Sequence, residues 1–220
     1  MNGQDRGRPV YLKQLELGPM QNFIYIIGCP ETRECAVIDP AWDVGTVLET
    51  LQADGYRVTH TIVTHCHPDH VNGLGGLLEA GPCRVHVQRA EAEFYKGLGL
   101  GSDLIPMDAG DEILVGKVPV RLLHTPGHTP GSQCFLVDEK LISGDTLFVG
   151  SCGRTDLPGG NPEELYHSLT ERLASLPGNT ILYPGHNYGH HPISTLADER
   201  RTNPFLQFTS LRSFLRAFGL

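Results

Sequence analysis

Apolar and polar residues alternate along the chain in short blocks that predict both strands and helices. Runs of β-branched and other apolar residues predict strands at residues 10–17, 23–27, 36–38, 61–63, 85–87, 113–123, 133–137, 140–143 and 180–183. Apolar residues at helical spacing predict helices at residues 44–51, 71–78, 90–95, 162–173, 194–201 and 211–218. Strands and helices recur in two comparable halves, which favours one domain, residues 10–220, with sheets at the centre and helices outside.

Glycine, proline and asparagine predict where several of these elements begin or end. Gly55 is a stop signal after the helix at 44–51, and Asn161 is a cap for the helix at 162–173. Gly116 and Pro119 are expected to break the strand run at 113–123. Residues 1–9 carry no periodic pattern and are expected to form a disordered lead.

Composition and charge exclude several classes of partner. The chain has 220 residues, of which 40% are hydrophobic and 19% charged, with a net charge of -8. This acidic balance argues against a nucleic-acid partner, which needs a basic surface. No apolar run approaches the length that crosses a bilayer, so no membrane partner is expected.

Cysteine usage and the amino terminus bear on location. The six cysteines include no Cys-x-x-Cys pair, and the first residues form no secretory signal. We therefore expect reduced thiols and a cytoplasmic location. Removal of an organelle-targeting segment stays open.

The densest group of candidate ligands follows the strand predicted at 61–63, in the run Thr-His-Cys-His-Pro-Asp-His at residues 64–70. Its candidate ligands are His65, His67, Asp69 and His70. In an extended segment, residues two apart point the same way, so the first three can share one face. His70 would enter from the first turn of the next helix. Imidazole and carboxylate groups of this kind suit zinc.

Three further candidate ligands follow predicted strands, each beside a glycine that lets the backbone turn sharply. They are His128 in a His-Thr-Pro-Gly-His-Thr-Pro-Gly run, Asp145 in Ser-Gly-Asp-Thr, and His186 in Tyr-Pro-Gly-His. Seven donors are too many for one tetrahedral zinc ion, which takes four. They fit two metals that share a bridging carboxylate. By contrast, His60 and His124 are expected to be core or capping residues.

This ligand pattern resembles that of the metallo-β-lactamase superfamily, across nearly the whole chain. The resemblance implies an α/β fold, an αββα sandwich of two mixed β-sheets flanked by helices. It implies that one metal is bound by His65, His67 and His128, and the other by Asp69, His70 and His186. Asp145 would bridge the two. The expected cofactors are two divalent metals, zinc first, with iron or manganese as alternatives.

Two such ions, about 3.5–4 Å apart, can hold a shared water and generate hydroxide near neutral pH. Besides binding metal, Asp69 is a catalytic candidate, because it can orient this hydroxide or accept its proton. The predicted enzyme is therefore a metallo-hydrolase, acting on a small thioester or a related ester or lactone.

Within the superfamily, the chain is most similar to the glyoxalase II-like thioester hydrolases. The segments at 143–156 and 199–205 look like theirs. Glyoxalase II adds a helical C-terminal domain that holds glutathione, whereas about 16 residues follow Pro204 here. A substrate linked to glutathione therefore stays an open prediction.

Persulfide dioxygenases are the main alternative, and they too resemble the chain at 152–156 and 165–168. By this resemblance His65, His128 and Asp145 would bind one Fe(II), leaving positions open for oxygen and a glutathione persulfide. Against it, these enzymes typically have alanine where this chain has Pro68 and Gly185. The hydrolase is preferred. A third alternative is a metal-binding scaffold without activity.

Three residues near the predicted ligands are candidates for contact with substrate. Arg154 can grip a substrate carboxylate or instead form a clamp with Asp156 that shapes its loop. Tyr188 and Asn187, beside the last histidine, can touch substrate or support that ligand. The apolar stripe of the helix at 211–218 packs on the body or on a second subunit, so a monomer and a homodimer both stay open.

Overall fold

The computed structural model describes residues 9–219, and in these the chain forms two six-stranded mixed sheets. The first sheet has the order β1-β2-β3-β4-β5-β6. Its strands are β1 (Tyr11–Leu17), β2 (Asn22–Gly28), β3 (Glu34–Ile38), β4 (Arg57–Ile62), β5 (Arg84–Gln88) and β6 (Leu104–Met107). The first three strands are antiparallel and the pairs from β3 to β6 are parallel, so the sheet is mixed.

The second sheet has the order β14-β13-β10-β9-β8-β7. Its strands are β7 (Glu112–Val115), β8 (Val118–His124), β9 (Gln133–Val137), β10 (Lys140–Gly144), β13 (Ile181–Pro184) and β14 (Ser194–Thr195). Only β10 and β13 pair in parallel. A separate small hairpin consists of β11 (Leu147–Phe148) and β12 (Ser151–Cys152).

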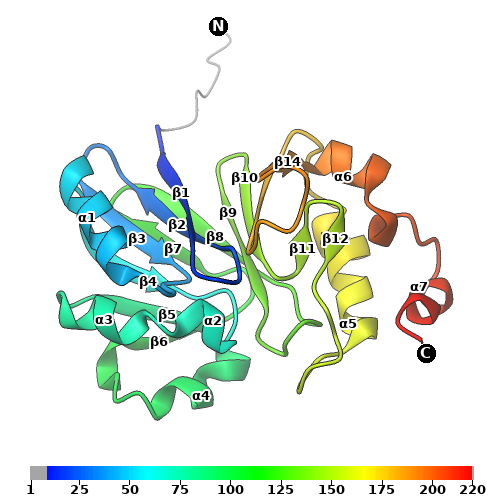
Figure 1. Cartoon of the computed structure of the whole chain (residues 1–220), viewed down its shortest axis with the longest axis horizontal. Helices are drawn as coiled ribbons and strands as arrows, with labels where there is room; N and C mark the ends of the chain where they lie inside the picture. The colour runs from blue at the N-terminus through cyan, green and yellow to red at the C-terminus, as the bar shows by residue number, and fades with distance from the viewer. Residues whose placement is uncertain (1–8, 220) are drawn as a thin grey trace, which may run out of the picture.

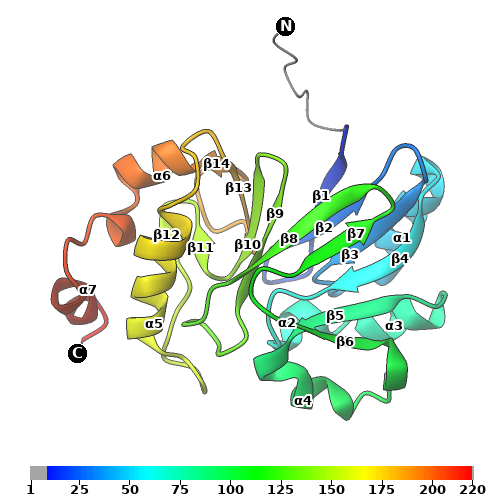
Figure 2. The same cartoon turned by 180° about the vertical axis from the view of Figure 1, so that it is seen from behind.

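Helices cover the outer faces of both sheets. The α-helices are α1 (Val44–Asp54), α2 (Pro68–Val71), α3 (Leu74–Glu79), α4 (Ala92–Lys96), α5 (Pro162–His167), α6 (Leu196–Thr202) and α7 (Leu211–Ala217). Short 3-10 turns occupy Arg89–Glu91, Gly101–Asp103 and Pro204–Leu206, and a π-helical turn, Ser168–Leu173, continues α5. Figures 1 and 2 show α1 and α3 on one flank and α5, α6 and α7 on the other. None of the described helices is both long and apolar enough to cross a membrane.

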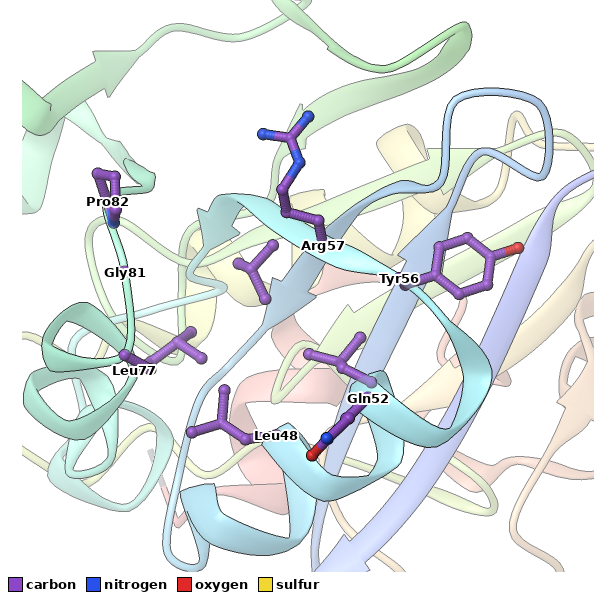
Figure 3. Close-up of a pocket in the computed structure, with 10 residues that line it drawn as sticks. Leu48, Gln52, Tyr56, Arg57, Leu77, Gly81 and Pro82 are labelled. Carbon is purple, nitrogen blue, oxygen red and sulfur yellow. The ribbon is translucent and has the colours of Figure 1, made fainter.

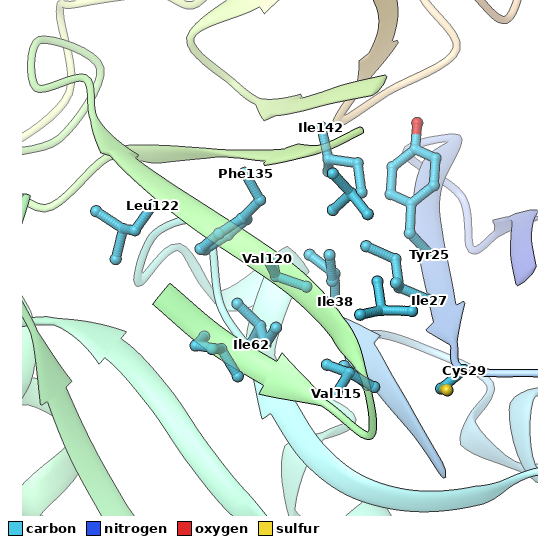
Figure 4. Close-up of a cluster of buried hydrophobic side chains, with 14 of the residues drawn as sticks. Tyr25, Ile27, Cys29, Ile38, Ile62, Val115, Val120, Leu122, Phe135 and Ile142 are labelled. Carbon is cyan, nitrogen blue, oxygen red and sulfur yellow. The ribbon is translucent and has the colours of Figure 1, made fainter. Parts of the chain in front are cut away.

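The largest apolar core lies between the two sheets. Figure 4 shows Tyr25, Ile27 and Ile38 of the first sheet packed towards Val120 and Phe135 of the second, and all five are buried. Three smaller apolar clusters fill the spaces between the sheets and their helices. The predicted αββα sandwich is confirmed. Each sheet buries one face in the central core and much of the other under helices, so its strands appear in the sequence as apolar runs.

Predicted element boundaries hold where the local signals are strong. Gly55 ends α1 in the left-handed conformation, with φ of 71°. The Asn161 side chain accepts hydrogen bonds from the backbone N–H groups of Glu163 and Glu164 and so caps α5. A tight turn that contains Gly116 separates β7 from β8, as expected. Residues 1–8 of the predicted lead lie outside the described residues.

Three expectations about element boundaries were wrong. The helix predicted from residue 194 begins at Leu196, because Ser194 and Thr195 pair with β13 as β14. Pro119 does not break a strand, because it lies within β8. At this position β8 pairs with β7 alone, and the pairing with β9 begins at Arg121. The N–H that proline lacks therefore has no β9 partner to lose.

The single helix expected at 71–78 is two helices. The helix is interrupted at Gly73, whose backbone passes close to α1. The Gly73 N–H donates a hydrogen bond to the Pro40 carbonyl, and Val44 leaves no room for a side chain at this position.

Candidate metal centre

The candidate ligands come from loops and a helix at one edge of both sheets. His65 and His67 follow β4, and the short helix α2 carries Asp69 and His70. The remaining ligands follow strands of the second sheet. His128 follows β8, Asp145 follows β10 and His186 follows β13. Distant segments therefore meet where the strands end.

The side chains form three overlapping groups that could hold a metal ion. The groups are His65, His67 and His128; Asp69, His70 and His186; and His65, His70 and Asp145. Within each group, the ligand atoms lie within 4.8 Å of one another. The first two groups are the ligand sets that the sequence predicts for the two metals.

Asp145 lies between these two sets. Its carboxylate oxygens are 3.5 Å from Nε2 of His128, 3.3 Å from Nε2 of His70 and 3.4 Å from Nε2 of His186. Its Oδ1 atom is buried and accepts no hydrogen bond. A buried carboxylate oxygen without a hydrogen bond is costly, and a cation at this point would satisfy it.

In three of the histidines, the ring nitrogen Nδ1 points away from the centre and faces an oxygen acceptor. Nδ1 of His128 lies 2.7 Å from the Arg154 carbonyl oxygen. Nδ1 of His186 lies 2.9 Å from the Met20 carbonyl oxygen, and Nδ1 of His70 lies 2.9 Å from the Asp39 carboxylate. Because these acceptors require an N–H, each Nδ1 carries a proton. In the neutral ring, Nε2 then presents its lone pair to the centre.

The inner ring nitrogens converge on one another. Nε2 of His70 and Nε2 of His186 are 3.1 Å apart, and Nδ1 of His67 lies 2.9 Å from Nε2 of His128. Two lone pairs at such distances repel unless a proton or a metal ion lies between them. Outer-shell oxygens that fix the inner nitrogens as ligands are typical of metal sites. The donor set therefore fits the metals that the fold implies.

Charge and burial act in opposite directions on these groups. Burial disfavours the charged form of His70, but the Asp145 and Asp39 carboxylates outweigh it and raise its pKa well above the ordinary value. Burial would also raise the pKa of Asp145, but the surrounding imidazoles hold it well below the ordinary value. Burial lowers the pKa of His65. The centre thus combines a stable carboxylate with imidazoles, a set that attracts a divalent cation.

A protein-family model described as the metallo-beta-lactamase superfamily matches residues 17–186. The chain belongs to the metallo-beta-lactamase superfamily. The mitochondrial persulfide dioxygenase ETHE1 of Homo sapiens is 34% identical over 97% of this chain and 82% of its own length. The hydroxyacylglutathione hydrolase of Nitrosococcus oceani is 35% identical over 83% of this chain and 68% of its own length. These relatives are enzymes, which supports an enzymatic role for this superfamily member.

A solved structure agrees with both the fold and the family. The crystal structure of ETHE1 from Myxococcus xanthus superposes on this chain with a TM-score of 0.87 and 32% identity. The match covers 95% of this chain and 90% of that one. The superfamily fold is therefore shared along almost the whole length, including the edge that carries the candidate ligands.

Two supporting residues at this edge are not apparent from the sequence pattern. Asp39 is buried and accepts hydrogen bonds from the backbone N–H and hydroxyl of Thr64, besides orienting His70. Asn22 donates through Nδ2 to the carboxylate of Asp69 at 2.9 Å and to its backbone carbonyl at 3.0 Å. The position of Asp39 directly after a predicted strand was the one available signal, and Asn22 offered none.

The three candidate substrate residues differ in placement. Arg154 forms a bidentate ion pair with Asp156, at 2.6 Å for both contacts, so the clamp geometry is the one present. The Tyr188 ring is 53% exposed and stacks on the His186 ring, with centroids 4.5 Å apart. The Asn187 side chain donates to Glu16 at 2.8 Å.

A cavity of about 490 Å³ lies away from this superfamily site, between α1, α3 and β4. Figure 3 shows Leu48 of α1 and Leu77 of α3 on facing sides of it, with Arg57 and Tyr56 along its rim. None of the residues that line it is a candidate metal ligand. Its size alone assigns it no role in the chemistry, and the metal centre is the candidate site.

Proposed function

We propose that this chain is a dinuclear metal-dependent hydrolase that cleaves small thioesters. The observation that carries the proposal is the meeting of two complete three-residue ligand sets at Asp145. A mononuclear enzyme needs only one such set. The expected metals are zinc, with iron or manganese as alternatives that accept the same ligands.

Two divalent ions in these sets would supply Lewis acidity and an activated water nucleophile at neutral pH. The chain's own residues would do the rest. Asp69, fixed by Asn22, would accept a proton from the attacking water. Attack on the thioester carbon breaks the carbon–sulfur bond and releases an acid and a thiol.

Aromatic residues beside the centre would bind the organic part of the substrate. Tyr188 stacks on His186, and the Phe148 ring lies 5.7 Å from the Tyr188 ring. Phe148 is buried, whereas Tyr188 is exposed, and exposed aromatic surface next to the candidate ligands is a suitable contact for a small organic group. The relative in Nitrosococcus oceani that is named a hydroxyacylglutathione hydrolase supports a glutathione thioester as the first substrate to assay.

A second candidate function is persulfide dioxygenation with one Fe(II). Its support is the 34% identity to the human persulfide dioxygenase ETHE1 over 97% of this chain. Two imidazoles and one carboxylate, from His65, His128 and Asp145, would bind the iron and leave coordination positions open. Here the set of Asp69, His70 and His186 would be dispensable for metal binding.

Metal counting combined with one variant distinguishes the two functions. The hydrolase predicts two metals per chain, thioester cleavage, and loss of one metal and most turnover in Asp69→Asn. The dioxygenase predicts one iron per chain, oxygen uptake with glutathione persulfide, and an unchanged iron content in Asp69→Asn. One iron and no thioesterase activity in the wild type would refute the hydrolase proposal.

A further inference from the structure

Two buried polar residues, one on α6 and one directly after it, lie outside the ligand sets yet contact a segment that leads into them. Glu199 is 2% exposed and Asn203 is 0% exposed. Both belong to the closing part of the chain, after the last candidate ligand. Buried polar side chains persist when they satisfy specific partners, so their partners indicate what they do.

Both side chains bond to the β11–β12 hairpin. Nδ2 of Asn203 donates to the backbone carbonyls of Phe148 at 3.2 Å and Ser151 at 3.0 Å. Glu199 accepts a hydrogen bond from the backbone N–H of Gly150 at 2.8 Å and one from Asn203 at 2.9 Å. This hairpin has only two residues in each strand, and the two side chains replace the ladder bonds that it lacks.

The same hairpin connects residues of the metal centre. It begins two residues after Asp145 and ends two residues before Arg154, whose carbonyl accepts the Nδ1–H of His128 at 2.7 Å. The return strand passes so close that a side chain at Gly153 would overlap the Asp145 carbonyl. The Phe148 ring also lies 5.9 Å from the His186 ring, edge to face.

We propose that Glu199 and Asn203 are positioning residues for the metal centre. They hold the hairpin so that the Arg154 carbonyl orients His128 and so that Asp145 keeps its place between the two ligand sets. This inference rests on the metal centre of the proposed function. It assigns a role in that centre to α6, an element that carries no ligand.

The test uses cobalt(II) titration of the full chain after metal removal, read by the visible spectrum and by chelator competition. Asn203→Asp keeps the shape of the side chain but removes the donor and faces two carbonyls with a carboxylate. Glu199→Ala removes the acceptor. Both should weaken cobalt binding by about 10- to 100-fold and shift the spectrum, because the orientation of His128 is lost.

Glu199→Gln is the conservative rescue, because its amide oxygen can accept the same two hydrogen bonds. It should restore affinity and spectrum to within about twofold of the wild type. Leu173→Ala, a core substitution in the same helical layer, controls for general destabilisation. It should lower the thermal unfolding midpoint without changing the cobalt spectrum.

Each result decides a different point. Wild-type affinity and spectrum in Glu199→Ala would overturn the positioning role while leaving the metal centre intact. The same spectral shift in Leu173→Ala would also overturn it, since loosening of the layer would then suffice. A wild-type chain that takes up no cobalt would refute the metal centre, and the positioning role with it.

Discussion

At the scale of single residues, Asp39 shows how a carboxylate outside the candidate ligand sets can fix the orientation of a candidate ligand, His70. It follows β3 directly, adopts a positive φ of 53° and accepts hydrogen bonds from Thr64 and His70. The left-handed conformation is unusual for a residue other than glycine, although aspartate tolerates it better than most. The hydrogen bonds compensate for it, and they aim the His70 ring inwards.

We therefore expect Asp39→Ala to weaken metal binding by about 10- to 100-fold, because His70 loses the acceptor that fixes its ring. Chelator competition followed by elemental analysis measures this. Asp43→Ala is a suitable control, because Asp43 lies close by in sequence and only caps α1. Equal metal affinities in both variants would contradict the role given to Asp39.

A second residue-scale prediction concerns the pair of half-buried His60 and buried His86, which lies outside the ligand sets. Nδ1 of His60 is 2.9 Å from Nε2 of His86. Burial, the neighbouring His60 and Arg84 lower the pKa of His86 to about 4. The folded state thus binds fewer protons than the unfolded state between that value and the ordinary one of about 6.5.

Stability should therefore fall as pH drops below about 6.5 and continue to fall to about 4, with a contribution from His86 of about 3 kcal/mol. Urea unfolding of the metal-free chain at several pH values measures it. The His86→Gln variant should show a shallower decline, since other titrating groups cancel in the comparison. Parallel curves for variant and wild type would exclude His86 as the source.

At the scale of elements, the return of the chain after β12 depends on a glycine. A side chain at Gly153 would lie 1.8 Å from the Asp145 carbonyl oxygen, a distance at which the backbone must move. Gly153→Ala should destabilise the fold by about 1–3 kcal/mol or more and reduce turnover, because Asp145 shifts with its backbone. Thermal unfolding measures the loss of stability, and the rate of thioester cleavage measures the loss of turnover.

Gly75→Ala is the matched control for this substitution. Gly75 lies in α3 with open space around the position of an added side chain. Alanine favours the helix there, so a gain of up to about 0.5–1 kcal/mol is expected. If both alanine variants changed stability in the same direction, the steric explanation at Gly153 would be wrong.

The elements also show which parts of the molecule a sequence can reveal. Long apolar runs predicted most strands of both sheets, because each sheet buries one face or both. The strand β6, the β11–β12 hairpin and β14 were missed. The two-residue strands carry no periodicity, and β6 has four residues and contains Pro106, which argues against a strand. The histidines and carboxylates at strand ends could be predicted from residue type. The residues that support them could not be predicted. Asn22 looks like an ordinary turn residue, and the resemblance at 199–205 gave Asn203 no role until the fold placed it beside the β11–β12 hairpin.

At the scale of the whole molecule, the candidate metal centre lies between the two halves of the sandwich. Four candidate ligands, His65, His67, Asp69 and His70, come from the first half, and the others come from the second. Metals bound across this edge would hold together segments as distant in sequence as His70 and His186, whose Nε2 atoms lie 3.1 Å apart. Without metal, a proton between these two nitrogens would have to replace the ion.

Metal removal should therefore lower the stability of the entire domain and not only its activity. A ligand that binds only the folded state stabilises it by about 2.7 kcal/mol at a concentration of 100 times its Kd. For a chain of this size, that corresponds to an increase in Tm of about 5–10 °C. Scanning calorimetry of the chelated chain at increasing zinc concentrations should show a continuous rise in Tm. The His186→Ala variant lacks a candidate ligand from the second half, so its Tm should rise less with zinc. A wild-type Tm that does not depend on zinc would exclude a metal that bridges the two halves.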